Sequence, residues 1–185
     1  MEKGPDKYQW KLRRILVTGP ESTGKTELAI RLADRFKGVA VEEYARTYVE
    51  NLDHPYDYED VVHIAEQQLS AYKTEYPEAE WVFFDTWLMI TKVWFEEVFN
   101  RVPHWLDEGI RTAQFDLVLL CAPDIPWIPD TVRENGGEDR EKLFERYRQE
   151  LVEYDLEWEL ITGNGENRFL LAEQIINRKL DYGRI

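Results

Sequence analysis

The segment Gly19-Pro20-Glu21-Ser22-Thr23-Gly24-Lys25-Thr26 constrains the fold of this chain more than any other stretch. It follows a short apolar run at residues 15–17 and precedes a segment with Leu28 and Leu32 at helical spacing. A strand, a loop bounded by two glycines and a helix, in that order, are the context in which the pattern Gly-x4-Gly-Lys-[Ser/Thr] wraps a polyphosphate. The sequence therefore predicts an α/β fold that binds a nucleoside triphosphate.

Each residue type in this loop has a physical task. The two glycines allow backbone angles and a close approach that a Cβ atom would prevent. The loop N–H groups and the positive end of the following helix attract phosphate oxygens. The lysine brings a positive charge to the β- and γ-phosphates, and the Thr26 hydroxyl is placed to bind Mg²⁺. We therefore expect ATP and Mg²⁺ as ligands, with nucleotide contacts from Gly19, Glu21, Ser22, Thr23, Gly24, Lys25 and Thr26.

The length and the charge of the chain limit the class of protein. The 185 residues suit one compact domain, which we place at residues 14–182 after an N-terminal extension at residues 1–13. A net charge of −14 argues against a general nucleic-acid binder and against a protein of anionic membrane surfaces. We therefore expect a small molecule as the partner, while both a monomer and a homo-oligomer remain open.

Cysteine usage and hydropathy bear on the compartment. Cys121 is the only cysteine, so no internal disulfide can form, which fits a reducing cytosol. It lies in an apolar run, and we expect it to pack in the core. The sequence has no apolar stretch long enough to span a membrane and no signal-peptide pattern at its start. A cytoplasmic protein is the expectation.

Strands and helices are predicted to alternate along the chain. Apolar runs typical of buried parallel strands occur at residues 15–17, 39–41, 81–85, 115–121 and 157–162. Segments with apolar residues at helical spacing separate and follow them, at residues 59–76, 88–100, 141–156 and 169–180. We therefore expect the three-layer P-loop NTPase fold, with a parallel five-stranded sheet and helices on both of its faces.

Polar side chains follow the second and third predicted strands. Glu43, Tyr44 and Arg46 come after residues 39–41, and Asp85 ends the third run. Because ligands bind at the carboxyl ends of strands in open parallel sheets, these side chains are site candidates. A charged helix start is the alternative for Glu43 and Arg46. Asp85 has the place of the second nucleotide motif, which contacts Mg²⁺ or its water.

Residues 128–142 have the composition of a lid. Arg133 and Arg140 flank the double glycine Gly136-Gly137, about two thirds along the chain. Small phosphoryl-transfer enzymes carry a lid at this place, whose arginines close over the phosphates and keep water out. The alternative is an ordinary charged hairpin between two helices.

Several segments together resemble a known family, the ribosylnicotinamide kinase domain of the multifunctional bacterial NAD-biosynthesis regulators. More broadly they are similar to P-loop kinases and AAA-like ATPase domains. The resemblance runs from about residue 14 to residue 180. Besides the phosphate loop, it is carried by Glu43-Tyr44-Ala45-Arg46, Phe84-Asp85-Thr86, Thr91-Lys92-Val93-Trp94, Pro123-Asp124-Ile125-Pro126-Trp127 with Arg133, and residues 163–168.

The resemblance implies transfer of the ATP γ-phosphoryl group to the 5′-hydroxyl of nicotinamide riboside. It implies catalytic roles for Lys25, Asp85, Glu43, Arg133 and Arg140, with either Glu43 or Asp85 as the proton acceptor. Asn164 and Arg168 would flank the adenine. The implied contacts to the nucleoside-type substrate are Glu43, Tyr44, Arg46, Asp85, Trp87, Asp124 and Trp127.

The chain also departs from the family that it resembles. Trp87 stands where such kinases have a second acid after Asp-Thr, and no H-x-G-H adenylyltransferase signature occurs. Two alternatives therefore stay open beside nicotinamide riboside. One is a kinase of another nucleoside or metabolite, and the other is an ATP-binding or ATPase regulatory module without kinase activity.

Overall fold

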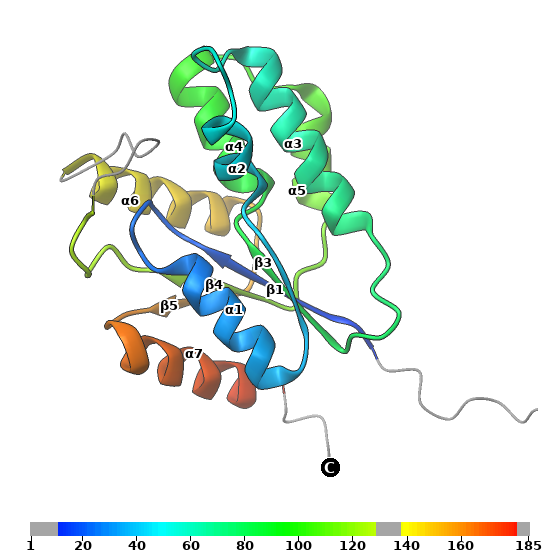
Figure 1. Cartoon of the computed structure of the whole chain (residues 1–185), viewed down its shortest axis with the longest axis vertical. Coiled ribbons are helices and arrows are strands. Elements are labelled where there is room, and N and C mark those ends of the chain that lie inside the picture. Colours follow the sequence, from blue (N-terminus) through cyan, green and yellow to red (C-terminus); the bar gives the residue numbers. More distant parts are fainter. Residues whose placement is uncertain (1–10, 129–137, 181–185) are drawn as a thin grey trace, which may run out of the picture.

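The computed structural model describes residues 11–128 and 138–180. In this part of the chain, five parallel strands form a sheet in the order β2-β3-β1-β4-β5 (Figure 1). Their bounds are β1 Arg13–Thr18, β2 Val39–Val41, β3 Trp81–Asp85, β4 Leu117–Cys121 and β5 Trp158–Ile161. Each of the five apolar runs in the sequence overlaps one strand, and β1 extends beyond its run at both ends. The predicted α/β fold with a parallel five-stranded sheet is confirmed.

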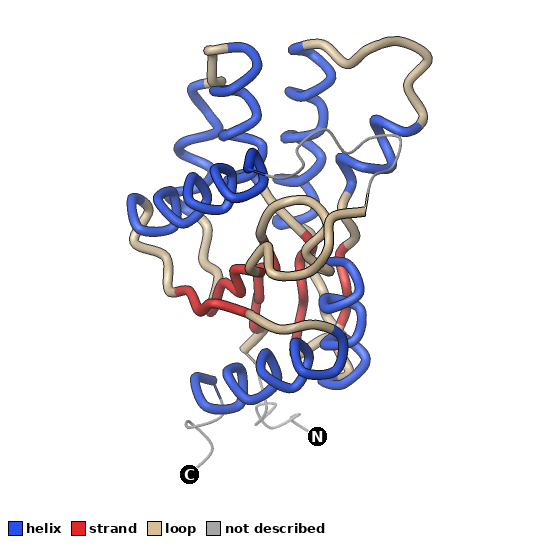
Figure 2. Tube along the Cα trace, turned by 90° about the vertical axis from the view of Figure 1, so that its left-hand side faces the viewer, coloured by secondary structure: helices blue, strands red, loops and turns tan. Residues whose placement is uncertain are grey.

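Helices cover both faces of the sheet, which lies between two helical layers (Figures 1 and 2). Helices α1 and α7 pack on one face, and α3 to α6 lie on the other. The helical bounds are α1 Lys25–Phe36, α2 Tyr44–Glu50, α3 Tyr58–Lys73, α4 Leu88–Trp94, α5 His104–Thr112, α6 Glu138–Glu153 and α7 Gly165–Leu180, with a π-helix η1 at Phe95–Phe99.

Alternate side chains of each central strand enter different cores. In β1, Leu16 belongs to the core beneath α3 to α6, whereas Ile15 and Val17 belong to the core beneath α1 and α7. In β3, Phe84 likewise belongs to the core beneath α3 to α6, and Phe83 belongs to the core beneath α1 and α7. A strand that is covered on both faces has no solvent-facing positions. This explains why the central strands are uninterrupted apolar runs in the sequence.

Three elements differ from the prediction. Helix α2 was predicted only as the charged helix start that is the alternative for Glu43 and Arg46. The helix expected at residues 88–100 is α-helical only to Trp94, and it continues as the π-helix η1 until Asn100 takes a left-handed φ of 47°. Helical spacing alone does not reveal such a wider turn. Helix α5 was not predicted, although it buries Leu106 and Ile110 at i, i+4 spacing.

Two sequence expectations about the core and the hydropathy can be compared with the structure. Cys121 is fully buried, and burial raises the pKa of its thiol to about 11, so it is a core residue as expected. In residues 11–128 and 138–180, none of the helices has the length and apolar character needed to cross a membrane.

Candidate active site

The phosphate loop joins the carboxyl end of β1 to α1. Gly19 has a φ of +140°, and a Cβ atom added to it would lie 2.6 Å from the carbonyl oxygen of Cys121. Only glycine fits this close approach of the loop to β4. Gly24, with a φ of 74°, is the N-cap of α1. The loop N–H groups therefore lie at the positive end of α1, where a phosphate is stabilised.

The side chains of the loop fold back onto it. The Thr23 hydroxyl and the Lys25 ammonium both donate to the carbonyl of Pro20, at 2.8 and 2.9 Å. The Ser22 hydroxyl accepts a hydrogen bond from the backbone N–H of Ile128 at 3.1 Å. Lys25 is only 8% exposed. The loop thus holds its lysine in place beside the helix N-terminus.

Asp85, at the end of β3, meets the first turn of α1. Its Oδ2 accepts a hydrogen bond from the Thr26 hydroxyl at 2.5 Å, while its Oδ1 is buried and has no hydrogen-bond partner among the described residues. Burial raises the pKa of Asp85, although the positive charge of Lys25 and the Thr26 hydroxyl act against this. A carboxylate oxygen without a partner beside a hydroxyl suits Mg²⁺, which takes a few protein oxygens and completes its shell with phosphates and water. Thr26 and Asp85 could therefore hold the metal.

Glu43 lies on the adjacent strand connection, as the N-cap of α2. In the sheet register Val41 pairs with Phe84, so the chain segments that lead to Glu43 and Asp85 leave the same edge. Burial raises the pKa of Glu43; the charge of Lys25 lowers it, and the charge of Asp85 raises it further. The structure thus brings Lys25, Asp85 and Glu43 into one electrostatic cluster.

Tyr44 and Arg46 lie on α2 beside this cluster. Arg46 forms an ion pair with Glu50 at 3.0 Å, and its charge lowers the pKa of both Glu43 and Asp85. The Tyr44 hydroxyl and His63 Nε2 are 2.9 Å apart. Among the described residues no group of three or more His, Cys, Asp or Glu side chains could hold a metal, so His63 belongs to no such cluster.

Arg168 forms hydrogen bonds to three loops at the same edge of the sheet. Its guanidinium donates to the carbonyl of Thr23 at 2.8 Å, to that of Gly163 at 2.7 Å and to that of Ala122 at 3.2 Å, and it pairs with Asp124. Asp124 also accepts from the Gly163 N–H at 2.7 Å. Arg168 and Asp124, expected at adenine and at substrate respectively, bond here to the protein itself.

A small hollow lies beside Arg168. It has a volume of about 60 Å³ and is lined in part by Gly24, Arg31, Ile125 and Phe169. Asn164, the other predicted adenine contact, is exposed at the start of α7 and does not line this hollow. Its carbonyl accepts the N–H of Asn167 at 3.1 Å.

The predicted lid is described only at its two ends. Arg133 lies outside the described residues, as do residues 129–137. Arg140, in the first turn of α6, is 5% exposed and donates to the carbonyls of Pro123 and Ile125. It therefore ties α6 to the loop after β4. In that loop the indole Nε1 of Trp127 is buried and has no hydrogen-bond partner among the described residues.

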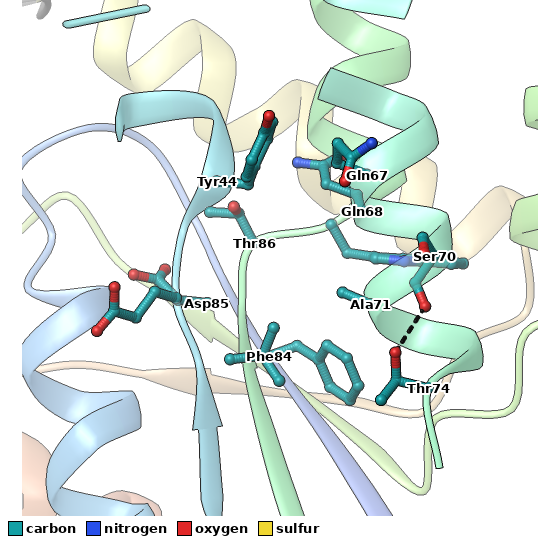
Figure 3. A pocket seen from close by; sticks show the side chains of 12 residues that line it. Tyr44, Gln67, Gln68, Ser70, Ala71, Thr74, Phe84, Asp85 and Thr86 are labelled. Carbon is teal, nitrogen blue, oxygen red and sulfur yellow. Dashed lines mark hydrogen bonds between the residues drawn. The ribbon is translucent and has the colours of Figure 1, made fainter. Parts of the chain in front are cut away.

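A cavity of about 280 Å³ opens between α3 and the ends of β2 and β3 (Figure 3). Asp85, Thr86 and Tyr44 lie on one side of it, and Gln67 and Gln68 on the other. The predicted substrate residue Trp87 lines it as well, although this side chain is only 2% exposed.

The α3 wall of this cavity was not predicted from the sequence. Gln68 is 7% exposed and stands four residues after the fully buried Ile64. A glutamine on the apolar face of a predicted helix was the available signal, because buried polar side chains need partners.

The fold and the phosphate loop define a P-loop nucleotide-binding protein. A glycine loop follows β1, the lysine and threonine start α1, and an aspartate ends the adjacent strand β3. The chain belongs to the AAA domain family, whose pattern matches residues 14–168.

Two curated proteins extend this comparison. The trifunctional NAD biosynthesis/regulator protein NadR of Salmonella typhimurium is 24% identical over 177 residues, which are 91% of this chain and 43% of that protein. Its Escherichia coli counterpart is 26% identical over 148 residues, or 77% of this chain and 36% of the relative. The resemblance seen in the sequence is confirmed. This chain spans less than half the length of these relatives.

Solved structures agree with the sequence relatives. NadR protein in complex with NR has a TM-score of 0.74 at 26% identity, over 92% of this chain and 50% of that one. NadR protein in complex with NAD and AMP-PNP has a TM-score of 0.73 with the same identity and coverage. Deoxyadenosine kinase from M. mycoides has a TM-score of 0.61 at 13% identity, over 89% of this chain and 98% of that one, and supports the fold alone.

Proposed function

We propose that this protein is an ATP-dependent phosphotransferase that phosphorylates the 5′-hydroxyl of a nucleoside, with nicotinamide riboside as the first acceptor. One observation carries the proposal: the side chain of Asp85 both bonds Thr26 of the phosphate-loop helix and lines the cavity beside α3. The nucleotide loop and a space for an acceptor therefore meet at a single carboxylate.

The chain supplies the groups that in-line phosphoryl transfer requires. Lys25 would stabilise the negative charge on the β- and γ-phosphates. Mg²⁺ held by Thr26 and Asp85 would neutralise further phosphate charge. Because burial raises the pKa of Glu43, its carboxylate is a stronger base than that of an exposed glutamate, and it shares one electrostatic cluster with Lys25 and Asp85. As the acceptor oxygen bonds to the γ-phosphorus and the bond to ADP breaks, the hydroxyl proton would pass to Glu43.

Nicotinamide riboside is favoured by the relatives. One matching NadR structure contains NR, which we interpret as nicotinamide riboside, and another contains NAD and AMP-PNP. The segments that carry the resemblance include Glu43-Tyr44-Ala45-Arg46 and Phe84-Asp85-Thr86, which surround the cluster described above. The cavity volume of about 280 Å³ is just below the usual range for small-molecule sites, roughly 300–1,000 Å³.

ATP consumption at fixed Mg²⁺, with and without nicotinamide riboside, tests this function. We expect strong stimulation by the acceptor and formation of nicotinamide mononucleotide. ATP binding without stimulation by this or any other nucleoside would overturn the kinase proposal and would favour an ATPase regulatory module instead. Stimulation by a different nucleoside would keep the reaction and replace the acceptor.

A further inference from the structure

The α3 side of the cavity has no task in the phosphate chemistry. In the proposed reaction the phosphate chemistry takes place on the side of Asp85. The opposite wall presents amides and hydroxyls, among them Gln67, Gln68 and Ser70 (Figure 3). This wall is the part of the site that can distinguish one acceptor from another. The following inference rests on the proposed function and concerns the acceptor at that same site.

Gln68 is held in one orientation. The Thr91 hydroxyl of α4 donates to its Oε1 at 2.6 Å, and both residues are buried, at 7% and 1% exposure. The amide oxygen of Gln68 therefore already accepts a hydrogen bond, and the amide nitrogen is the group that could still donate one to a ligand. Within the described part of the chain, this Nε2 donates to no other residue, while Gln68 is one of the side chains that line the cavity. Gln68 thus offers the cavity a fixed N–H₂ donor.

Trp87 supplies a second donor. Its indole Nε1–H is buried without a hydrogen-bond partner among the described residues, and Trp87 is one of the residues that line the same cavity. The ring is fixed by Tyr72 and Phe115, whose centroids lie 5.2 and 4.9 Å away. A buried donor without an acceptor is costly, and a ligand oxygen would remove that cost.

The charge of the residues that line the cavity indicates what kind of ring the ligand carries. Its two charged lining residues, Glu42 and Asp85, are both acidic. Tyr44, Phe84 and Trp87 add aromatic surface. Aromatic faces and carboxylates together favour a flat ring that carries positive charge.

We propose that Gln68 and Trp87 form a donor pair that recognises a carbonyl substituent on a flat, positively charged ring of the acceptor nucleoside, with Thr91 as the residue that positions Gln68. Trp87, which replaces the acid of related kinases, is then a specificity-determining residue. The carboxamide of a pyridinium riboside has the required chemistry.

Equilibrium binding, measured by calorimetry with a non-hydrolysable ATP analogue present, separates this inference from catalysis. The probes are nicotinamide riboside and the pyridinium riboside that lacks the carboxamide. For the wild-type protein we expect the carboxamide to tighten binding about tenfold or more, because a site built around donors rejects a ligand that leaves them unpaired.

Variants test the individual donors. Gln68→Met and Trp87→Phe should each raise the Kd for nicotinamide riboside about three- to tenfold and leave the Kd for the carboxamide-free riboside unchanged. Thr91→Val should weaken the same preference while the glutamine is still present. Trp94→Phe, the same exchange on α4, is the control, because the ring of Trp94 packs on Tyr56 and does not line the cavity. It should leave both Kd values unchanged.

The outcomes distinguish the two proposals. Equal binding of the two ribosides by the wild-type protein, with phosphorylation of both, would overturn the donor pair and keep the kinase. Equal weakening of both ribosides in Trp87→Phe would also overturn it, since only packing would then be lost. If the wild-type protein binds neither riboside, the acceptor class is wrong and the donor pair falls with it. The comparison of ribosides on the wild-type protein decides even where a variant fails to fold.

Discussion

Replacement of Lys92 tests the network that joins α4 to α6, the helix that carries Arg140. The Lys92 ammonium lies 2.7 Å from Glu150 and 2.9 Å from Glu96, and Arg146 completes the network at 3.2 and 2.5 Å from the same two carboxylates. The side chain of Glu150 is fully buried. Lys92→Met would leave this buried carboxylate with Arg146 as its cation.

Removal of one partner of a buried ion pair costs about 3–5 kcal/mol. Because Arg146 remains, we expect the lower end, roughly 3 kcal/mol of unfolding free energy. A typical total is about 5–15 kcal/mol, so the loss is large. For a chain of this length it corresponds to a fall in melting temperature of roughly 6–12 °C.

Urea unfolding at neutral pH measures the effect. The double variant Lys92→Met with Glu150→Leu should recover most of the loss, because no unpaired buried charge remains. Lys142→Met is the control: its ion pair with Asp139 is 71% and 64% exposed, and exposed pairs contribute roughly 0–1 kcal/mol. A loss below about 1 kcal/mol in Lys92→Met, or a double variant less stable than the single one, would refute this reasoning.

The network also has a pH dependence. Burial acts to raise the pKa of Glu96, but hydrogen bonds from Lys92 and Arg146 hold it below its ordinary value. A group with a lowered pKa contributes stability above its unfolded pKa and loses it as the pH falls through the folded pKa. The cost of Lys92→Met should therefore shrink below about pH 4, the range where glutamates become protonated.

Three further predictions concern the phosphate loop and Glu43, the proposed proton acceptor. Lys25→Ala should lower phosphoryl transfer at least about 100-fold in a coupled assay and leave the melting temperature nearly unchanged, because the lysine serves the nucleotide. Gly19→Ala should destabilise the fold by roughly 1–3 kcal/mol in urea unfolding, since its Cβ would meet the Cys121 carbonyl. Glu43→Gln should slow transfer but raise the melting temperature at pH 8 and not at pH 4, because the buried carboxyl has a raised pKa and costs stability only when ionised.

The fold was predictable because the strong signals in the sequence are local. The phosphate loop, the five apolar runs and the helical spacing each depend on neighbouring residues, and each corresponds to an element of the structure. The π-helix at Phe95–Phe99 was not predictable in this way. Its residues have partners far away in the sequence, such as Arg146 of α6, which donates a hydrogen bond to Glu96.

The candidate site was predictable at the strand edge and not beyond it. Asp85 ends β3 and Glu43 comes two residues after β2, so the sheet itself brings both carboxylates toward Lys25. Gln68 reaches the same cavity from a helix, and only the tertiary packing of α3 against α4 shows that Thr91 orients it. The pairing of Arg168 with the Thr23 carbonyl, 145 positions apart in the chain, is likewise a property of the folded molecule.

The hydrogen bonds of Arg168 determine what would be lost if the chain were split into two fragments. Its single guanidinium fastens segments that come from the beginning, the middle and the end of the chain, at Thr23, Ala122 and Gly163. A fragment that stopped before α7 would retain the phosphate-binding residues and most of the sheet but would lose this fastening. If the protein were split before α7, nucleotide affinity would therefore depend on the reassociation of the two fragments. Helix α7 is thus the segment to supply as a separate peptide in a complementation experiment.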